Sequence, residues 1–231
     1  MNDVVWSKVR LVVFDLDGTL YDQPPLRRAM AIELARHSLR RRSLRTAETL
    51  RAFRQIRELL GKVQGDDFPN EQFRLTSRRC GCSEGEVRAL VEEWIERRPL
   101  AHLPRYKAQG IDALFAALRA TGRRIAIWSD YPVHAKLAAL GLQADHVLWS
   151  GDRGVGRLKP DPAGLLALLE AAGATPEETL VIGDRKDRDA AAAAAIGVRA
   201  LIRSPRPQGH AMFRRFDDPA FAPVLAEARH V

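Results

Sequence analysis

The sequence predicts an α/β fold, a doubly wound parallel sheet (a Rossmann-like core) with an inserted helical domain. Three observations support this prediction. Short apolar runs alternate with helical stretches from about residue 106 onward, as they do in doubly wound sheets. The apolar run 9–14 precedes Asp-Leu-Asp-Gly-Thr, so carboxylates follow a strand at the end where open α/β sheets bind ligands. Residues 22–105, between these two parts, contain no convincing strand.

The strands are predicted from short apolar runs. The first, residues 9–14, is typical of a parallel strand that is covered on both faces. Later runs predict further strands at 124–128, 146–149, 179–182 and 198–202. Helices are predicted near 109–121, 132–140, 161–172 and 188–196. Glycine, which is common just beyond a helix C-terminus, follows several of them, at Gly122, Gly141, Gly173 and Gly197. Asp218-Pro219 can begin a last short helix.

The insertion is predicted to be helical because its apolar residues recur at helical spacing. Apolar residues at every third or fourth position from Leu50 to Leu60 share one helix face, and arginines occupy the other side. We therefore expect two domains. Residues 1–21 and 106–231 form the core, and residues 22–105 form a helical domain inserted between the first and second candidate motifs.

Composition and the N-terminal sequence favour a cytoplasmic protein. The chain has no run of about 18 apolar residues that would predict a membrane-spanning helix. Its first residues lack the basic and apolar segments of a secretory signal. Cys80 and Cys82 have no His–Cys pattern of a zinc site, so we expect two reduced cysteines without a role in metal binding.

The charge is moderately basic, with 37 Lys and Arg residues against 29 Asp and Glu and a formal net charge of +8. Arginine suits phosphate and carboxylate ligands, and the balance leaves nucleic acid open as a partner. The arginine triplet at 40–42 argues against a dedicated nucleic-acid surface, because successive helical residues point about 100° apart. Arg27, Arg28 and Arg36 either meet an anionic group of the substrate or face solvent, and the sequence leaves both alternatives open.

Polar residues follow the first predicted strand in an arrangement that suits a small site. Asp15 and Asp17 are two residues apart, so in extended chain their side chains face the same way. Gly18 permits a sharp turn, and Thr19 adds a hydroxyl group. An acidic turn without a function is the alternative interpretation of this segment alone.

Further polar residues lie at later strand ends and in the loop between them. Ser129 follows the second predicted strand, and Lys159 lies in a loop that Pro160 stiffens. Asp184 follows a later strand, within the sequence Gly183 to Asp189. Each of these residues has an ordinary structural explanation. Together they supply a nucleophile, an acid, a hydroxyl, a cation and a metal-binding carboxylate at one edge of a sheet, which indicates a catalytic site.

On these residues the chain resembles the haloacid dehalogenase superfamily. The four motifs of that family correspond in order to Asp15-Leu16-Asp17-Gly18-Thr19, to Ser129, to Lys159 and to Gly183-Asp184 through Asp189. The helical insertion has the position of the family's cap domain. One departure is Asp130, where such proteins often have Asn or Thr beside a phosphate-binding amide, and we expect its side chain to turn away from the phosphate.

The resemblance and the chemistry of these residues together imply their roles. Asp15 is expected to attack phosphorus and form an aspartyl-phosphate, while Asp17 protonates the leaving alkoxide and later deprotonates water. Thr19, Ser129 and Lys159 are expected to hold the phosphoryl group.

A Mg²⁺ ion is expected between the Asp15 carboxylate, the backbone carbonyl oxygen of Asp17 and Asp184. Asp187 and Asp189 would lie in its outer shell and orient waters or Lys159. The spacing GDxxxxD, common in the family, favours Asp189 of these two.

An acidic residue at position 17 favours a phosphatase over a dehalogenase, because an alkoxide needs a proton when it leaves and a halide does not. We expect Mg²⁺-dependent hydrolysis of a small phosphorylated metabolite, similar to the reaction of phosphoglycolate phosphatases. A sugar phosphomutase and a phosphatase acting on nucleotides or nucleic-acid ends are the alternatives. No membrane partner is expected, and neither the metabolite nor the oligomeric state follows from the sequence.

Overall fold

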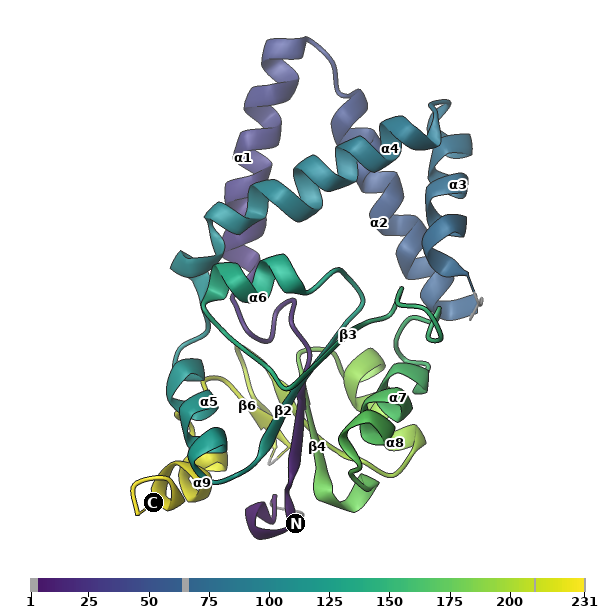
Figure 1. Ribbon diagram of the computed structural model, residues 1–231. Helices are drawn as coiled ribbons and strands as arrows, with labels where there is room; N and C mark the ends of the chain where they lie inside the picture. Colours follow the sequence, from purple (N-terminus) through teal and green to yellow (C-terminus); the bar gives the residue numbers. More distant parts are fainter. Residues whose placement is uncertain (1–3, 64–66, 210, 231) are drawn as a thin grey trace.

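The computed structural model describes residues 4–63, 67–209 and 211–230. Within these ranges the core is a six-stranded sheet in which neighbouring strands are parallel, in the order β3-β2-β1-β4-β5-β6 (Figure 1). This sheet confirms the predicted fold class. The strands are β1 Leu11–Phe14, β2 Arg124–Ser129, β3 His146–Trp149, β4 Thr179–Gly183, β5 Arg199–Arg203 and β6 Met212–Phe213.

The strand order places a ligand-binding crevice beside β1. The chain runs from β1 outward through β2 and β3, then returns to add β4 on the other side of β1. Such a reversal opens a crevice at the carboxyl ends of the two central strands. Residues that follow β1, β2 and β4 therefore lie next to one another at this edge of the sheet.

Both faces of the sheet are covered by apolar packing, which is why β1 is apolar at every position. Val12 and Phe14 pack with side chains of α5, α6 and α9, whereas Leu11 and Val13 pack with α7 and α8 on the opposite face (Figure 1). The alternation follows from the two-residue period of a strand. These helices are α5 Ile111–Ala120, α6 His134–Leu140, α7 Ala163–Ala172, α8 Ala191–Ala195 and α9 Ala222–Glu227.

The described residues between 22 and 106 are helical, without a strand. Figure 1 shows their long helices above the carboxyl edge of the sheet. The chain enters and leaves this segment through two linkers that lie side by side: the amide of Asp22 donates to the carbonyl of Tyr106 at 2.8 Å, and that of Ala108 donates to Leu20 at 2.9 Å. The elements are α1 Gln23–Arg41, α2 Arg45–Val63, α3 Phe68–Cys80, α4 Glu84–Val91, a π-helical turn Glu92–Arg97 and 3-10 turns Arg98–Ala101 and Leu103–Tyr106.

Several boundaries differ from those predicted. The chain from Lys186 to Ala190 forms a π-helical turn before α8, and strand β6 is too short to show as an apolar run. Asp161 accepts a hydrogen bond at 2.9 Å from the amide of Ala163, the first residue of α7, although the N-cap position is Pro162. The chain after Asp218 forms a 3-10 turn, Pro219–Phe221, and then α9, as predicted. Further 3-10 turns are Trp6–Lys8 and Pro176–Glu178.

Two sequence-based expectations concern features outside the sheet. Cys80 and Cys82 are free cysteines, and both are partly buried. Among the described residues, no helix combines the length and the apolar character needed to cross a bilayer.

Candidate active site

Asp15 lies directly after β1 and is almost completely buried at the carboxyl edge of the sheet. Its backbone amide donates to the carbonyl of Ile182 in β4 at 2.8 Å, which continues the strand pairing by one residue. The Oδ1 atom of Asp15 accepts from Lys159 Nζ at 2.8 Å, and its Oδ2 atom accepts from Thr19 Oγ1 at 3.0 Å. Three predicted site residues are thus in direct contact.

Gly18 is required by the turn that follows Asp15. Its φ of +97° lies in the region that residues with a side chain rarely adopt. A Cβ atom at this position would also lie 2.2 Å from Asp184 Oδ2. The turn therefore packs directly against the carboxylate that follows β4, and glycine allows this close approach.

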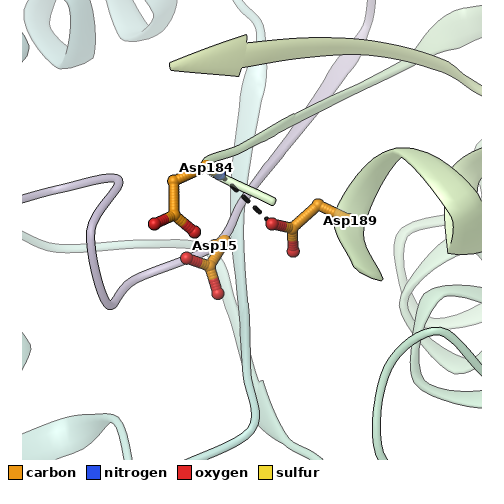
Figure 2. Close-up of side chains that lie close together, drawn as sticks. All are labelled: Asp15, Asp184 and Asp189. Atoms are coloured by element: carbon orange, nitrogen blue, oxygen red, sulfur yellow. Dashed lines mark hydrogen bonds between the residues drawn. The ribbon is translucent and has the colours of Figure 1, made fainter. Parts of the chain in front are cut away.

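Asp184 and Asp189 complete an acidic cluster with Asp15. Figure 2 shows the three carboxylates converging, and one ligand oxygen from each lies within 4.8 Å of the others. Two backbone amides fix the carboxylate of Asp189. Its Oδ2 atom accepts from the amide of Asp184 at 3.2 Å and from that of Arg185 at 3.0 Å. A Cβ atom on Gly183 would lie 2.3 Å from Asp189 Cγ, so a glycine is needed here too.

The structure does not bring Asp187 to this cluster. Its side chain is 69% exposed and pairs with Arg185 at 2.7 Å. Asp187 therefore orients neither Lys159 nor the acidic cluster, whereas Asp189 contacts both. Of the two candidates that the sequence left open for the outer shell, Asp189 is the one at the site.

Lys159 is the cation at the centre of the cluster. Its ammonium group is buried and donates three hydrogen bonds of 2.8 Å, to Asp15, to Asp189 and to the backbone carbonyl of Trp128. Burial alone would lower the pKa of Lys159, but Asp15 and Asp189 reverse this effect and raise it. Lys159 is therefore charged at neutral pH, and one positive charge faces three carboxylates.

The cluster fits a hard divalent cation. Carboxylate oxygens are the ligands that Mg²⁺ and Ca²⁺ prefer. Burial raises the pKa of Asp15 well above its ordinary value despite Lys159, and Asp189 and Asp184 add to the effect. Burial and the charge of Asp189 raise the pKa of Asp184 to about 6. A bound cation would supply the positive charge that these buried carboxylates lack, and Asp15, Asp184 and Asp189 are the residues that can hold it.

This electrostatic imbalance predicts a pH-dependent effect of Mg²⁺ on stability. Because the pKa of Asp184 is raised on folding, the metal-free protein should lose stability as the pH rises from about 4 to about 6. A cation that binds only the folded state should raise the melting temperature, by roughly 5–10 °C at 100 times its Kd. Since protons compete with the cation, we expect a larger increase at pH 7 than at pH 5.

Thermal unfolding with and without MgCl₂ at both pH values measures this effect. Asp184→Asn should reduce the increase at pH 7, and Asp187→Asn, the same change at an exposed carboxylate, should leave it intact. An increase that is equal at the two pH values, or that persists in Asp184→Asn, would contradict a cation site at this cluster.

Asp17 makes a second set of contacts, different from those of the acidic cluster. Its Oδ1 atom accepts from Lys136 Nζ at 2.5 Å and from the hydroxyl of Tyr21. Its Oδ2 atom accepts from Ser129 Oγ at 3.4 Å. Burial would raise the pKa of Asp17, but Lys136, Tyr21 and Ser129 outweigh it and hold the pKa below its ordinary value. Tyr21 and Lys136 belong to none of the four sequence motifs.

Ser129 is the last residue of β2, Asp130 follows it, and the two have different surroundings. Ser129 Oγ accepts from the amide of Tyr131 at 3.1 Å while donating to Asp17. The carboxylate of Asp130 accepts from Ser150 Oγ at 2.8 Å, from the amide of Lys159 at 3.1 Å and from Arg188 at 3.0 Å. Asp130 thus links the loop after β2 to the loop that carries Lys159 and to the turn that carries Arg188.

The acidic cluster and Asp17 both line a cavity of about 570 Å³. The core contributes charged residues, and helices α1 and α2 and the turn after α4 contribute Leu26, Met30, Leu34, Leu50 and Trp94. Arg27 also lines the cavity and is exposed. Arg28 and Arg36 are exposed and are not among the described residues that line it.

Arg57 and Glu58 of α2 connect the inserted helices to the core. The sequence motifs do not include either residue. Arg57 is buried, donates to the backbone carbonyl of Asp130 and lies 3.7 Å from the ring centroid of Tyr131. Glu58 pairs with Arg188 at 2.9 Å and with Arg185 at 3.0 Å. The helical spacing of apolar residues in α2 gives no sign of these contacts, because they depend on how α2 is placed over the sheet.

Comparison with known proteins agrees with this geometry. Residues 9–197 match the family model of the haloacid dehalogenase-like hydrolases. Phosphoglycolate phosphatase of Rhodospirillum rubrum is 31% identical over 202 residues, which are 84% of this chain and 79% of that protein. Phosphoglycolate phosphatase 1 of Pseudomonas aeruginosa is 30% identical over 82% of this chain and 67% of that protein. The crystal structure of a 2-haloacid dehalogenase from Pseudomonas syringae pv. Tomato DC3000 superposes with a TM-score of 0.62, at 22% identity, over 95% of this chain and 99% of the other.

The chain belongs to the haloacid dehalogenase-like hydrolases, because the family model matches most of its length. The similarity to the dehalogenase structure shows the common fold alone, since the two chains are only distantly related. The curated relatives are phosphatases, and this chain is an enzyme of the phosphatase branch of the family.

Proposed function

We propose that the protein hydrolyses small phosphomonoesters in two steps, with Mg²⁺ as cofactor and an aspartyl-phosphate on Asp15 as intermediate. The observation that carries this proposal is the pair of aspartates in one cavity with opposite surroundings. Asp15 is held by Lys159 and Thr19 within the acidic cluster, whereas Asp17 faces Lys136, Tyr21 and Ser129. Because the two carboxylates have separate contacts, one can form the covalent bond while the other stays free to transfer protons in a two-step reaction.

In the first step the Asp15 carboxylate attacks phosphorus. Lys159 holds the carboxylate in place from Oδ1 and Thr19 from Oδ2, so the side chain is oriented before the substrate arrives. We expect the same ammonium and hydroxyl, together with Ser129, to lie beside the transferring phosphoryl group, where the charge of Lys159 and the two hydroxyl groups offset the negative charge that it gains.

Asp17 is the proton donor to the leaving oxygen and, in the second step, the base that takes a proton from water. Its contact with Ser129, 3.4 Å from Oδ2, keeps the carboxylate beside a predicted phosphate-binding group. Splitting the reaction into two steps allows one carboxyl group to act first as acid and then as base.

The acidic cluster is the proposed position of Mg²⁺, held by the carboxylates of Asp15 and Asp184, with Asp189 beside them. The sequence also predicts the backbone carbonyl oxygen of Asp17 as a ligand. When bound, the ion offsets the negative charge of the phosphate dianion and of the nucleophile. Lys159, which contacts Asp15 and Asp189, holds these two carboxylates in position.

We further propose that residues 22–105 form a cap domain over a core of residues 1–21 and 106–231. The two adjacent linkers support a hinge there, and the cavity that is lined from both sides supports a role in choosing the substrate. The two phosphoglycolate phosphatases among the relatives support a small phosphorylated metabolite as substrate. A cytoplasmic location stays a prediction from the sequence.

The test of this function is turnover of an aryl phosphate such as p-nitrophenyl phosphate. We expect phosphate release in the presence of MgCl₂ and its loss, by a factor on the order of 10³ or more, when EDTA removes the cation. Ca²⁺ should substitute poorly, because its larger and more flexible coordination shell misplaces the nucleophile.

Restoring excess MgCl₂ after EDTA treatment is the control for denaturation, and it should recover the full rate. Unchanged turnover in metal-free buffer would exclude this mechanism, and absence of turnover on every phosphomonoester tested would exclude the proposed activity.

A further inference from the structure

Lys136 is a buried cation beside the proposed proton donor, and neither the family motifs nor the mechanism above assigns it a role. It lies in the first turn of α6, its side chain is 7% exposed, and it lines the cavity. Its Nζ atom is 2.5 Å from Asp17 Oδ1 and 5.2 Å from the ring centroid of Tyr131.

The ammonium group of Lys136 has hydrogen-bonding capacity to spare. A lysine ammonium has three N–H donors. Those of Lys159 each have an acceptor, in Asp15, Asp189 and the carbonyl of Trp128. For Lys136, Asp17 is the one hydrogen-bond acceptor found among the described residues. A charged group that is buried at a cavity wall with donors left over is suited to bind an anionic part of a ligand.

The position of Lys136 also specifies which part of a substrate it would meet. Asp17 must lie against the ester oxygen in order to protonate it, so the leaving group extends from the phosphate past Asp17. Lys136 is the neighbour of Asp17 on the side opposite Ser129, because the two residues contact different oxygens of the same carboxylate. The first atoms of the leaving group beyond the ester oxygen therefore come close to the ammonium group.

The contacts of Lys136 favour an anion at this position. Asp17 takes one N–H group of the ammonium group, which leaves two donors at the cavity wall without an acceptor among the described residues. A carboxylate on the leaving group would accept hydrogen bonds from these donors. A single carboxylate matches the single charge of Lys136, whereas a second phosphate group would bring two.

We propose that Lys136 is the binding site for a carboxylate attached to the carbon next to the ester oxygen, so that the preferred substrates are phosphate esters of 2-hydroxy acids. The proposal rests on the proposed function and deepens it, because it names the substrate class for the same cavity. Lys136 then donates to the substrate carboxylate with an N–H group that Asp17 does not use.

The first test compares two substrates that differ in one charge, phosphoglycolate and its amide. For the wild-type enzyme we expect kcat/KM to favour the carboxylate by a factor on the order of 10 to 100, as for a charge-assisted hydrogen bond in a buried site. Lys136→Met should reduce this ratio to about 1, although both rates fall because Asp17 loses its partner. Lys136→Arg, which keeps the charge, should retain most of the preference, and Lys136→Gln gives a second neutral variant.

Lys62→Met is the matched control, because it makes the same change at an exposed lysine of α2 outside the cavity lining, and it should leave the ratio unchanged. A wild-type enzyme that does not prefer the carboxylate overturns the proposal without any variant. A ratio that stays within about twofold of wild type in Lys136→Met overturns it as well.

A binding measurement separates this proposal from the proposed function. In an Asp15→Asn background, where no covalent step occurs, calorimetry should show tighter binding of phosphoglycolate than of its amide, and adding Lys136→Met should remove the difference. If the wild-type enzyme hydrolyses p-nitrophenyl phosphate but this difference is absent, the substrate class is wrong and the activity stands. If the difference is present but no phosphomonoester is hydrolysed, the binding site stands and the activity is wrong.

Discussion

Asp15→Asn is expected to abolish turnover of every phosphomonoester, with a loss on the order of 10⁴-fold or more, as for removal of nucleophiles in other enzymes. An amide cannot attack phosphorus to form the acyl-phosphate, so no later step is reached. The variant should remain folded, because Lys159 keeps Asp189 and the carbonyl of Trp128 as hydrogen-bond partners. Single-turnover phosphate release and thermal unfolding measure the two effects separately.

The control for this prediction is Asp187→Asn, which makes the same chemical change at an exposed carboxylate that pairs with Arg185. Its turnover should stay within about threefold of wild type, as expected for a surface substitution. Residual turnover of Asp15→Asn above a few parts in ten thousand, with an unchanged melting temperature, would show that another group attacks phosphorus.

The fold and the position of the site could be predicted because both depend on local patterns. Strand β1 is an apolar run without gaps, and the residues just after it must lie at the carboxyl edge of a parallel sheet. The same argument brings Ser129, at the end of β2, and Asp184, after β4, to that edge. The two-residue strand β6 has no such pattern, because its pairing with β5 depends on tertiary packing.

Other features of the site could not be read from the sequence, because they depend on where helices lie. Lys136 faces Asp17 only because α6 packs beside the carboxyl end of β2. Arg57 reaches the carbonyl of Asp130 only because α2 lies over that loop. The spacing GDxxxxD favours Asp189 over Asp187, but their contacts depend on the π-helical turn from Lys186 to Ala190, which places Asp189 against Lys159 and leaves Asp187 exposed.

The sequence contains a second indication, besides the spacing GDxxxxD, that Asp189 lies at the site. Gly183 directly precedes Asp184, and the structure shows that a side chain there would collide with Asp189. A glycine at the end of a buried strand often marks a close approach of another group. The corresponding glycine after β1, Gly18, marks the approach of Asp184 in the same way.

Asp17→Asn is expected to lower turnover of alkyl phosphates by a factor on the order of 10²–10⁴, the usual worth of general acid–base catalysis. Part of the loss could come from structure rather than chemistry, because Lys136 then loses its counter-charge in a buried site. The double variant Asp17→Asn/Lys136→Met removes both charges. It should recover the melting temperature that Asp17→Asn loses, while turnover stays low.

Comparing substrates with different leaving groups shows whether Asp17 acts as a general acid or has only a structural role. An alkoxide needs a proton as it departs, whereas p-nitrophenolate is stable as an anion, so the first step with p-nitrophenyl phosphate should be much less sensitive to Asp17→Asn. Burst kinetics resolve that step from breakdown of the aspartyl-phosphate, in which Asp17 acts as base for both substrates. Tyr21→Phe, which removes a hydrogen bond to Asp17 but not its proton, should affect the two leaving groups alike. If Asp17→Asn slows the first step equally for alkyl and aryl phosphates, the proton for the leaving oxygen comes from another group, and Asp17 serves only to position Lys136 and Ser129.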